Sequence, residues 1–555
     1  QIIEEKQGEY TVNRTYDSEG NCTRITSSLG ADIRHTYDRE GNLQTMQAGE
    51  SWQASWVRDN TGLEVQRTFS GGVTVRTERD CFGREVRKSV QSGGIERGAY
   101  RYQWGIANRL LSKENELTGT VTRYDYDRFD FLIRQETIQG SETDVIYRTP
   151  DFVGNLFETP DKKDRKYGAG GKLLEDPDCF YHYDDEGNLI FREFKQLQET
   201  GVRFDRKRME KERGIHFLAT GTGWLYEWSS SGMLKKVIRP DGRPVEFRYD
   251  ALGRRTAKQY FGKITRWVWD GNVPIHEWSY KVTDMQSNEE EGSLPKEPTE
   301  DITTWVFEAG TFVPTAKMQD GKQYSIVSDY LGTPIQMYNE QGDKTWDCTL
   351  DIYGKVLTVN KGSEFDCPFR FQGQYTDEET GLYYNRFRYY DSSIGNYISQ
   401  DPIGLAGNNP TVYGYISDSN NWLDIYGLTR LPRKNGSWSG KAGDSIWNST
   451  NPKVIAITGG EGIVFQNGYP NFDKWSKGNM DFDNLTGTNK DFELVYERLK
   501  NDMNLKSKAE AKRFLQQNGL TPHHHENMKT IQLIPTDLNA NIPHEGGASR
   551  IRNKH

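Results

Sequence analysis

The sequence predicts a mainly β chain that ends in a separate, smaller α+β part. A short pattern, Tyr-Asp-x-x-Gly, recurs before residue 370. The 555 residues include 30 Tyr, 14 Trp and 55 Gly, a composition typical of short strands joined by tight turns. Charge and histidine content change after residue 428, and a chain of this length is too long for one compact core.

A turn sequence repeats through residues 1–370 and predicts how this part folds. The clearest copies are residues 16–21 (YDSEGN), 37–42 (YDREGN), 183–188 (YDDEGN) and 249–254 (YDALGR), with weaker copies at 80–84, 151–155, 228–232 and 351–355. In each clear copy the aromatic residue ends a strand, Asp opens the turn, and Gly takes a positive φ. Because one unit cannot bury its own face, the units must stack into a continuous sheet.

Residues 371–428 separate the two parts and contain two turn signals. Residues 401–405 (DPIGL) and 424–428 (DIYGL) each place Asp at a turn start and Gly three residues later. Two ordinary turns that close a β domain explain this spacing. Alternatively, the carboxylates of Asp401 and Asp424 meet, so that one holds a proton while the other activates water. Spacing alone leaves both interpretations open.

The same stretch resembles the C-terminal core of Rhs/YD-repeat proteins, on residues 386–391 (RFRYYD), 401–405 and 422–424 (WLD). The resemblance implies that residues 1–370 spiral into a hollow, cocoon-like shell. It also implies that residues 371–428 form an intramolecular aspartyl protease.

By the same resemblance, the protease cuts between Leu428 and Thr429, with Asp401 and Asp424 as its acid/base pair. Ile425 stands where the family has proline, so the second motif lacks the fixed φ of a proline residue.

The C-terminal part differs in charge from the rest. Residues 429–555 hold 18 Lys and Arg against 13 Asp and Glu, a net of +5, whereas the remainder holds 53 against 67, a net of −14. A basic domain favours a nucleic-acid partner, although so small an excess also arises by chance. Residues 429–450 are polar and rich in Gly and Ser, which predicts a linker before a domain at residues 451–555.

Local patterns predict the elements of residues 451–555. Residues 454–457 (VIAI) are expected to form a strand, and residues 491–503 a helix with an apolar face. Residues 507–510 (SKAE) form a capping box that opens a second helix, which Gly519 closes.

A histidine run dominates the end of the chain, where five of the nine histidines lie at or after position 523. The pattern predicts a strand, a turn at residues 526–529, a strand at 530–534, and a short helix capped by Thr536. Strand geometry sends adjacent His523 and His524 to opposite sides, so one can bind a divalent cation while the other activates water. A surface histidine run without function is the alternative.

This segment resembles the WHH branch of the HNH/endonuclease VII superfamily, on residues 523–525 (HHH), 532–539 (QLIPTDLN) and 544–547 (HEGG). Pro522 replaces the signature Trp, and Asn539 replaces a His. The resemblance implies a ββα-metal nuclease motif within a small α+β toxin domain.

The implied roles follow residue by residue. His524 is the general base. His523, Asn539 and His544 are ligands of a divalent metal ion, Mg²⁺ or Zn²⁺. By their charge, Arg550 and Arg552 are candidates for holding the phosphate backbone of the nucleic acid; a solvated basic tail is the alternative.

Together, the two resemblances imply a polymorphic toxin, a secreted effector whose metal-dependent DNA endonuclease is freed by cleavage after Leu428 and acts in the cytoplasm of a competing bacterial cell. The implied partners are DNA, a cognate immunity protein and a secretion apparatus, either a type VI spike (VgrG) or an N-terminal portion of the same polypeptide. No apolar run is long enough to span a bilayer, so no stable membrane insertion is expected.

Two alternatives stay open. One is a YD-repeat surface adhesin or carbohydrate-binding scaffold with an inert C-terminus. The other is the C component of an ABC-type insecticidal toxin.

Overall fold

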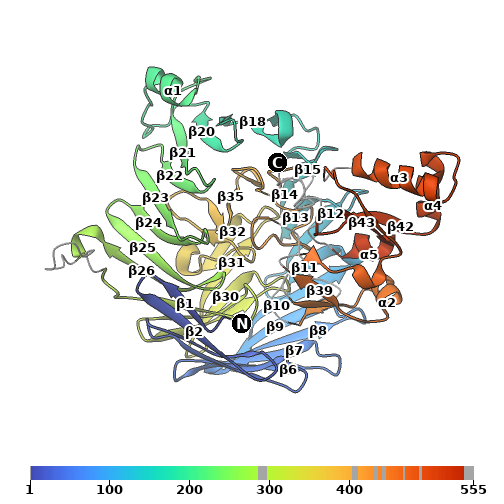
Figure 1. Ribbon diagram of the computed structural model, residues 1–555. Helices are drawn as coiled ribbons and strands as arrows, with labels where there is room; N and C mark the ends of the chain where they lie inside the picture. Colours follow the sequence, from blue (N-terminus) through green and yellow to red (C-terminus); the bar gives the residue numbers. More distant parts are fainter. Residues whose placement is uncertain are drawn as a thin grey trace. The chain divides into compact units, whose positions relative to one another are not determined.

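The computed structural model describes residues 2–285, 297–402, 411–428, 436–439, 445–466, 469–486 and 490–542 (Figure 1). The chain divides into two compact units. Unit 1 comprises Gln1–Gln400, Tyr413–Asn420 and Ile425–Gly427, and unit 2 comprises Asp401–Val412, Asn421–Asp424 and Leu428–His555.

Unit 1 is built on two long antiparallel sheets in which each strand pairs with the next along the chain. The first sheet has 14 strands: β1 (Glu4–Gln7), β2 (Tyr10–Tyr16), β3 (Cys22–Ser27), β4 (Asp32–Tyr37), β5 (Leu43–Ala48), β6 (Trp52–Arg58), β7 (Glu64–Phe69), β8 (Val73–Arg79), β9 (Glu85–Ser92), β10 (Ile95–Trp104), β11 (Leu110–Asn115), β12 (Thr120–Tyr126), β13 (Leu132–Gln139) and β14 (Glu142–Tyr147). A two-stranded sheet follows, β15 (Thr149–Pro150) and β16 (Leu156–Phe157).

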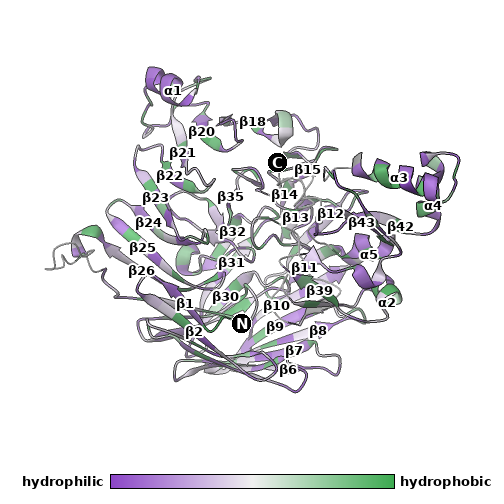
Figure 2. Cartoon of the chain, viewed as in Figure 1, coloured by the Kyte–Doolittle hydropathy of each residue, from purple (hydrophilic) through white to green (hydrophobic). Residues whose placement is uncertain are grey.

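The second long sheet has 16 strands: β17 (Lys166–Tyr167), β18 (Leu173–Glu175), β19 (Cys179–Tyr183), β20 (Leu189–Phe194), β21 (Gly223–Trp228), β22 (Leu234–Ile238), β23 (Pro244–Tyr249), β24 (Arg255–Tyr260), β25 (Lys263–Asp270), β26 (Val273–Lys281), β27 (Thr303–Phe307), β28 (Pro314–Gln319), β29 (Lys322–Ser328), β30 (Pro334–Asn339), β31 (Lys344–Leu350) and β32 (Val356–Lys361). The helix α1 (Arg206–Arg213) lies between β20 and β21 and is mostly hydrophilic (Figure 2). The mainly β fold expected from the repeats is therefore confirmed.

The repeated turns use one hydrogen-bond pattern. In the first, the Asp17 N–H donates to the Asn21 carbonyl at 3.0 Å, and the Asn21 N–H donates to the Asp17 carboxylate at 2.8 Å. Gly20 has a φ of +92°, which is the left-handed region that glycine adopts without strain. Asp38 and Asp250 accept the amide of the residue four positions later in the same way. The turn chemistry predicted from the repeats is thus confirmed.

The two long sheets share a core within unit 1. Val12 and Trp52 from the first sheet pack in one cluster with Trp278 and Val327 from the second. Hydrogen bonds between polar groups also join the two sheets across this core. For example, the Trp52 indole N–H donates to Ser325 Oγ at 3.0 Å. The strand pattern of alternating apolar and polar residues therefore serves to bury one sheet against the other.

Residues from the stretch after β32 pack on the second sheet. They form a small sheet of β33 (Tyr375–Thr376), β34 (Tyr383–Asn385), β35 (Arg388–Asp391) and β36 (Asn396–Tyr397). At the junction, the buried Arg255 pairs with Asp377 at 2.5 Å and lies 4.4 Å from the ring centroid of Trp267 and 4.6 Å from that of Tyr384. Asp377 is fully buried and also pairs with Lys258. Residues 375–397 are therefore part of the folded core of unit 1.

The described residues of unit 2 form two small sheets and four α-helices. One sheet contains β37 (Gly436–Trp438), β38 (Ile446–Ser449), β39 (Ile463–Gln466) and β40 (Tyr469–Pro470); the other has the order β41 (Asn479–Asp481), β43 (Thr530–Pro535), β42 (Leu520–His524). The helices are α2 (Pro452–Thr458), α3 (Lys490–Asp502), α4 (Lys508–Gln517) and α5 (Thr536–Asn541). Short 3₁₀ turns occur in both units: Ser70–Gly72, Ile106–Asn108, Ala169–Gly171, Val282–Asp284, Glu364–Asp366 and Asp473–Trp475.

Three local expectations for unit 2 need correction. Residues 454–457 form helix α2 and not a strand, because the Asn451 side chain caps its first turn, Pro452 suits that turn, and Gly459 ends it at a φ of +68°. Thr536 does not cap α5; it is the first helical residue, and its hydroxyl bonds that of Thr521.

The third correction concerns residues 429–450. The part described includes β37 and β38, where a linker was expected. Trp447 is almost fully buried in the core of unit 2 and supplies the apolar anchor that the Gly/Ser-rich composition conceals. Among the described residues, no helix is both long and apolar enough to cross a bilayer.

Two buried histidines predict how unit 1 responds to acid. Ser27 Oγ and Thr304 Oγ1 contact the two ring nitrogens of His276, at 2.6 and 3.0 Å. Burial lowers the pKa of His276 to about 4, and burial likewise lowers the pKa of His35 to about 4. Between pH 6.5 and pH 4 the unfolded chain therefore binds protons that the folded chain does not.

The free energy of unfolding should then fall as the pH falls through this window, by about 1.4 kcal/mol per pH unit for each histidine. Urea unfolding of the full chain at pH 7 and pH 5 measures the effect. His276→Gln should reduce the pH dependence, whereas His216→Gln, at a side chain that is 71% exposed, should leave it unchanged. Equal pH dependence in all three chains would refute the assignment.

Candidate functional site

The second predicted Asp motif folds into the same turn as the repeats. The Asp424 carboxylate is buried and accepts the Leu428 N–H at 2.8 Å, and Gly427 has a φ of +69°. This bond matches that between Asp17 and Asn21. Asp424 therefore holds Leu428, the residue whose carbonyl carbon the predicted cut would attack.

Backbone contacts within unit 1 hold the middle of this turn. The Phe387 N–H donates to the Tyr426 carbonyl at 3.3 Å, and Arg388 Nε donates to the Gly427 carbonyl. The Arg388 guanidinium in turn lies 3.6 Å from the ring centroid of Tyr397. Arg388 belongs to the RFRYYD segment, so this motif serves in part to secure the turn.

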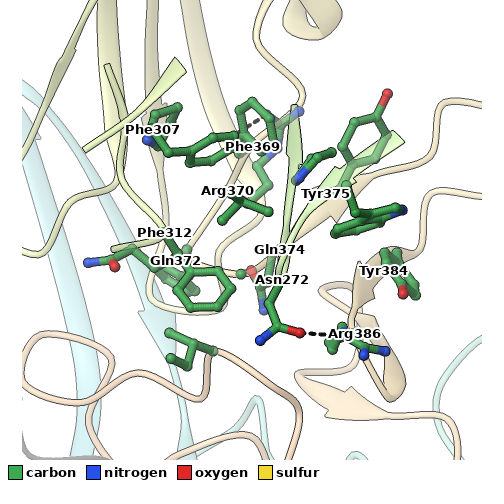
Figure 3. A pocket seen from close by; sticks show the side chains of 17 residues that line it. Asn272, Phe307, Phe312, Phe369, Arg370, Gln372, Gln374, Tyr375, Tyr384 and Arg386 are labelled. Atoms are coloured by element: carbon green, nitrogen blue, oxygen red, sulfur yellow. Dashed lines mark hydrogen bonds between the residues drawn. The ribbon is translucent and has the colours of Figure 1, made fainter. Parts of the chain in front are cut away.

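Ile425 occupies the position where the family has proline, and its side chain is 1% exposed. It lines a pocket in unit 1 whose walls include Phe307, Phe312 and Tyr375 (Figure 3). Burying an isoleucine contributes about 1.5–3 kcal/mol, so packing here restrains a loop that proline would restrain through φ.

Gly373, from the FQGQ segment, lies against the same turn. Its φ is +87°, and a Cβ placed on it would lie 2.2 Å from the Ile425 carbonyl oxygen. Glycine is therefore required here both by conformation and by the close approach of the two backbones.

Asp401 is also buried, and its N–H donates to the Val412 carbonyl at 2.8 Å. Both Asp401 and Asp424 belong to unit 2. Residues 403–410 and Thr429 lie outside the described residues. The action of Asp401 and Asp424 as an acid/base pair therefore stays a prediction.

The histidine run folds as the predicted strand–turn–strand–helix, from β42 through β43 to α5. His523 pairs in register with Gln532, and His524 pairs with Ile531. The His523 ring meets Phe472 edge-on at 5.3 Å, whereas the His524 ring lies 5.2 Å from that of Phe492. The two histidines thus face opposite sides of the sheet, as the strand pattern predicted.

The His524 side carries a buried carboxylate. Asp491, at the start of α3, is 1% exposed, and its Oδ2 lies 2.9 Å from His524 Nε2. Thr486 donates to this carboxylate from both its backbone N–H and its hydroxyl. Nothing in the sequence singles out Asp491, because acidic residues are common in the first turn of a helix, where the helix dipole favours them.

His525 has a different environment. Its Nδ1 accepts the Asn527 N–H at 3.1 Å, and its Nε2 lies 3.2 Å from the Asp473 carboxylate. Asp473 also accepts the Gln532 amide at 2.7 Å. With both ring nitrogens engaged, His525 closes the turn between β42 and β43.

The proposed metal ligands are only partly described. His523 is nearly buried, and Asn539 is half-buried on α5, which packs against β42 and β43. Imidazole nitrogen and amide oxygen are both donors that divalent cations accept, so these two residues fit a metal site. Within the described ranges, no three His, Cys, Asp or Glu side chains gather in a group that could hold a metal ion.

His544, Arg550 and Arg552 lie outside the described residues. Their predicted roles therefore stay predictions.

Comparison with known proteins identifies both parts of the chain. Residues 156–411 match the Teneurin YD-shell family, and residues 462–546 match the DNase/tRNase domain of colicin-like bacteriocins. These matches confirm the predicted resemblance to a YD-repeat protein of the Rhs type with a C-terminal nuclease domain.

Curated relatives support the same assignment. Double-stranded DNA deaminase toxin A of Burkholderia cenocepacia is 30% identical over 416 residues, which cover 70% of this chain and 27% of that protein. Probable deoxyribonuclease RhsA of Dickeya dadantii is 28% identical over 439 residues, which cover 76% and 28%. The chain thus spans little more than a quarter of their length.

Among solved structures, the crystal structure of TcdB2-TccC3 aligns with a TM-score of 0.38 at 17% identity, covering 77% of this chain and 26% of that one.

The crowding at Gly373 predicts a marked loss of stability on substitution. Gly373→Ala adds a Cβ that meets the Ile425 carbonyl at 2.2 Å, in addition to the strain of a positive φ. Gly381 is a matched control, because it has a φ of +71° and nothing within 4 Å of a Cβ. Thermal unfolding should show a much larger decrease for Gly373→Ala than for Gly381→Ala. Equal decreases would mean that the turn yields without penalty.

Proposed function

We propose that this YD-repeat chain with a colicin-DNase-like domain is a polymorphic toxin whose cargo is a metal-dependent DNA endonuclease of HNH type. In this proposal residues 1–370 form the shell, 371–428 cut the chain, and 451–555 form the nuclease, whose sheet is extended by β37 and β38 of the segment 429–450. One observation carries it: the colicin-DNase match over residues 462–546 contains the unit from β42 to α5 that bears His523 and His524.

DNA is the proposed substrate. One relative is a probable deoxyribonuclease and another is a DNA deaminase toxin, which supports a DNA-directed activity. An adhesin or carbohydrate-binding scaffold would leave the nuclease match without a role.

The nuclease residues divide the work. His523, Asn539 and His544 would hold a divalent cation, Mg²⁺ or Zn²⁺, whose positive charge would stabilise negative charge on the phosphate and on the leaving 3′ oxygen. His524 takes a proton from a water molecule, whose oxygen bonds to phosphorus while the bond to the 3′ oxygen breaks, and the 3′ oxygen then takes a proton from solvent.

Arg550 and Arg552 would contact the phosphate backbone on either side of the cut. Both residues are basic and lie within the last six positions of the chain.

The chain is proposed to cut itself between Leu428 and Thr429. The Asp424 carboxylate accepts the Leu428 N–H, a bond that favours its ionised form, so Asp424 is assigned as the base. It takes a proton from a water molecule that attacks the Leu428 carbonyl carbon. Asp401, as the acid, donates a proton to the Thr429 nitrogen when the peptide bond breaks.

The proposed biological setting is competition between bacteria. A type VI spike (VgrG) or an N-terminal portion of the same polypeptide would deliver the toxin, and the nuclease would act in the target-cell cytoplasm. The producing cell would need a cognate immunity protein, since a free DNA endonuclease would attack its own chromosome.

Self-cleavage predicts two fragments. Intact-mass analysis of the purified chain should show a break after Leu428 that is absent from Asp424→Asn. Asp418→Asn is the matched control, because Asp418 is also buried and accepts a backbone N–H, from Asn420 at 2.9 Å. This variant should still be cut. A wild-type chain that remains uncut would overturn the protease assignment. If Asp418→Asn also remains uncut, the loss of cleavage in Asp424→Asn would be attributed to impaired folding.

Nuclease activity predicts that His524 is indispensable. Cleavage of supercoiled plasmid by the full chain with Mg²⁺ or Zn²⁺ should fall by about 100-fold or more in His524→Ala, the range for loss of a general base. His525→Gln should retain cleavage, since its ring nitrogens are engaged in the turn and lie outside the proposed chemistry. Undiminished cleavage by His524→Ala would exclude His524 as the base.

A further inference from the structure

We infer that Asp491 is a positioning residue of the nuclease, which orients the His524 imidazole and selects the ring nitrogen that accepts the proton. The inference rests on the nuclease function proposed above and names a residue outside the histidine run. It starts from the 2.9 Å contact between Asp491 Oδ2 and His524 Nε2, which joins two side chains that are 1% and 5% exposed.

The carboxylate itself is held by the chain just before α3. The Thr486 N–H lies 2.9 Å from Oδ1 and 3.0 Å from Oδ2, and the Thr486 hydroxyl donates to Oδ1 at 2.8 Å. Hydrogen bonds from the Thr486 N–H and hydroxyl favour the ionised form of the Asp491 carboxylate, which can only accept hydrogen bonds. Asp491 is therefore an acceptor toward His524.

This arrangement determines the tautomer of His524. Because Asp491 accepts, the proton of the neutral imidazole must lie on Nε2. Nδ1 then carries the lone pair and is the nitrogen that takes a proton from water. Without Asp491 the ring would lose the acceptor that favours a proton on Nε2.

Asp491 and His524 both belong to secondary-structure elements that are packed in the core of unit 2. On α3, Val495 and Leu499 bury one face in a core that also contains Ile531 of β43. His524 ends β42, which pairs with β43. The carboxylate and the imidazole are thus placed by rigid secondary structure, as a catalytic geometry requires.

A buried His–Asp pair can also serve stability alone, and the two roles predict different kinetics. A positioning residue acts only through His524. Asp491→Asn should then lower the rate at saturating DNA by about 10-fold or more and leave the apparent DNA affinity unchanged. In a His524→Ala background the same substitution should cause no further loss.

The experiment uses the full chain and a DNA duplex with Mg²⁺. The four chains compared are the wild type, Asp491→Asn, His524→Ala and the double variant. Thr486→Val, which removes only the hydroxyl donor to Asp491, should give a smaller loss of rate. Asp502→Asn, at the exposed end of the same helix, is the matched control and should cut at the wild-type rate.

A measurement on the metal-free chain tests the pair without catalysis. In ¹⁵N-histidine-labelled protein, the hydrogen-bonded Nε2–H of His524 should give a downfield ring N–H signal that is absent from His524→Gln. Asp491→Asn should shift or remove this signal, while thermal unfolding shows whether the variant is folded.

Each outcome bears on the inference. If His524→Ala is inactive and Asp491→Asn cuts at the wild-type rate, the inference is wrong and the nuclease proposal stands. If Asp491→Asn lowers the rate equally in both backgrounds, Asp491 does not act through His524. If His524→Ala cuts normally, the assignment of His524 falls, and the positioning role with it.

Discussion

A hydrogen bond from a backbone amide to an Asp carboxylate four residues earlier recurs throughout this chain, and the fold depends on it. It measures 2.8 Å at Asp17, 2.9 Å at Asp250 and 2.8 Å at Asp424. A bond to a charged acceptor contributes about 1.5–3 kcal/mol, so its repetition holds a long series of strands in register. At Asp424 the same bond holds Leu428, so the structural unit of the sheet also prepares the proposed cut.

A second constraint joins the stretch that contains this cut to the sheet. Arg255 and Asp377 form a buried ion pair, and the guanidinium lies against Trp267 and Tyr384. Removing one partner of such a pair leaves an uncompensated buried charge, which is strongly destabilising. The packing of residues 371–400 on the second sheet therefore contributes to the stability of unit 1.

In the candidate nuclease site, neighbouring residues of one strand face opposite sides of a sheet. Alternation along β42 directs His523 toward Phe472 and His524 toward Asp491. Adjacent residues of the same type thereby acquire different surroundings, and a ligand and a base can come from one dipeptide. The turn after β42 uses His525 for its own closure, so the three histidines have three different environments.

The sequence alone determined the features set by neighbouring residues. These were the Asp-Gly turns, the strand–turn–strand–helix after residue 519, and the helix opened by Ser507. It failed at residues 454–457, where caps on either side outweighed a run of strand-forming residues. Only the tertiary structure decided that Gly373 meets Ile425 and that Asp491 meets His524. Those partners lie 52 and 33 residues apart, and no local preference specifies a contact that depends on how whole elements pack.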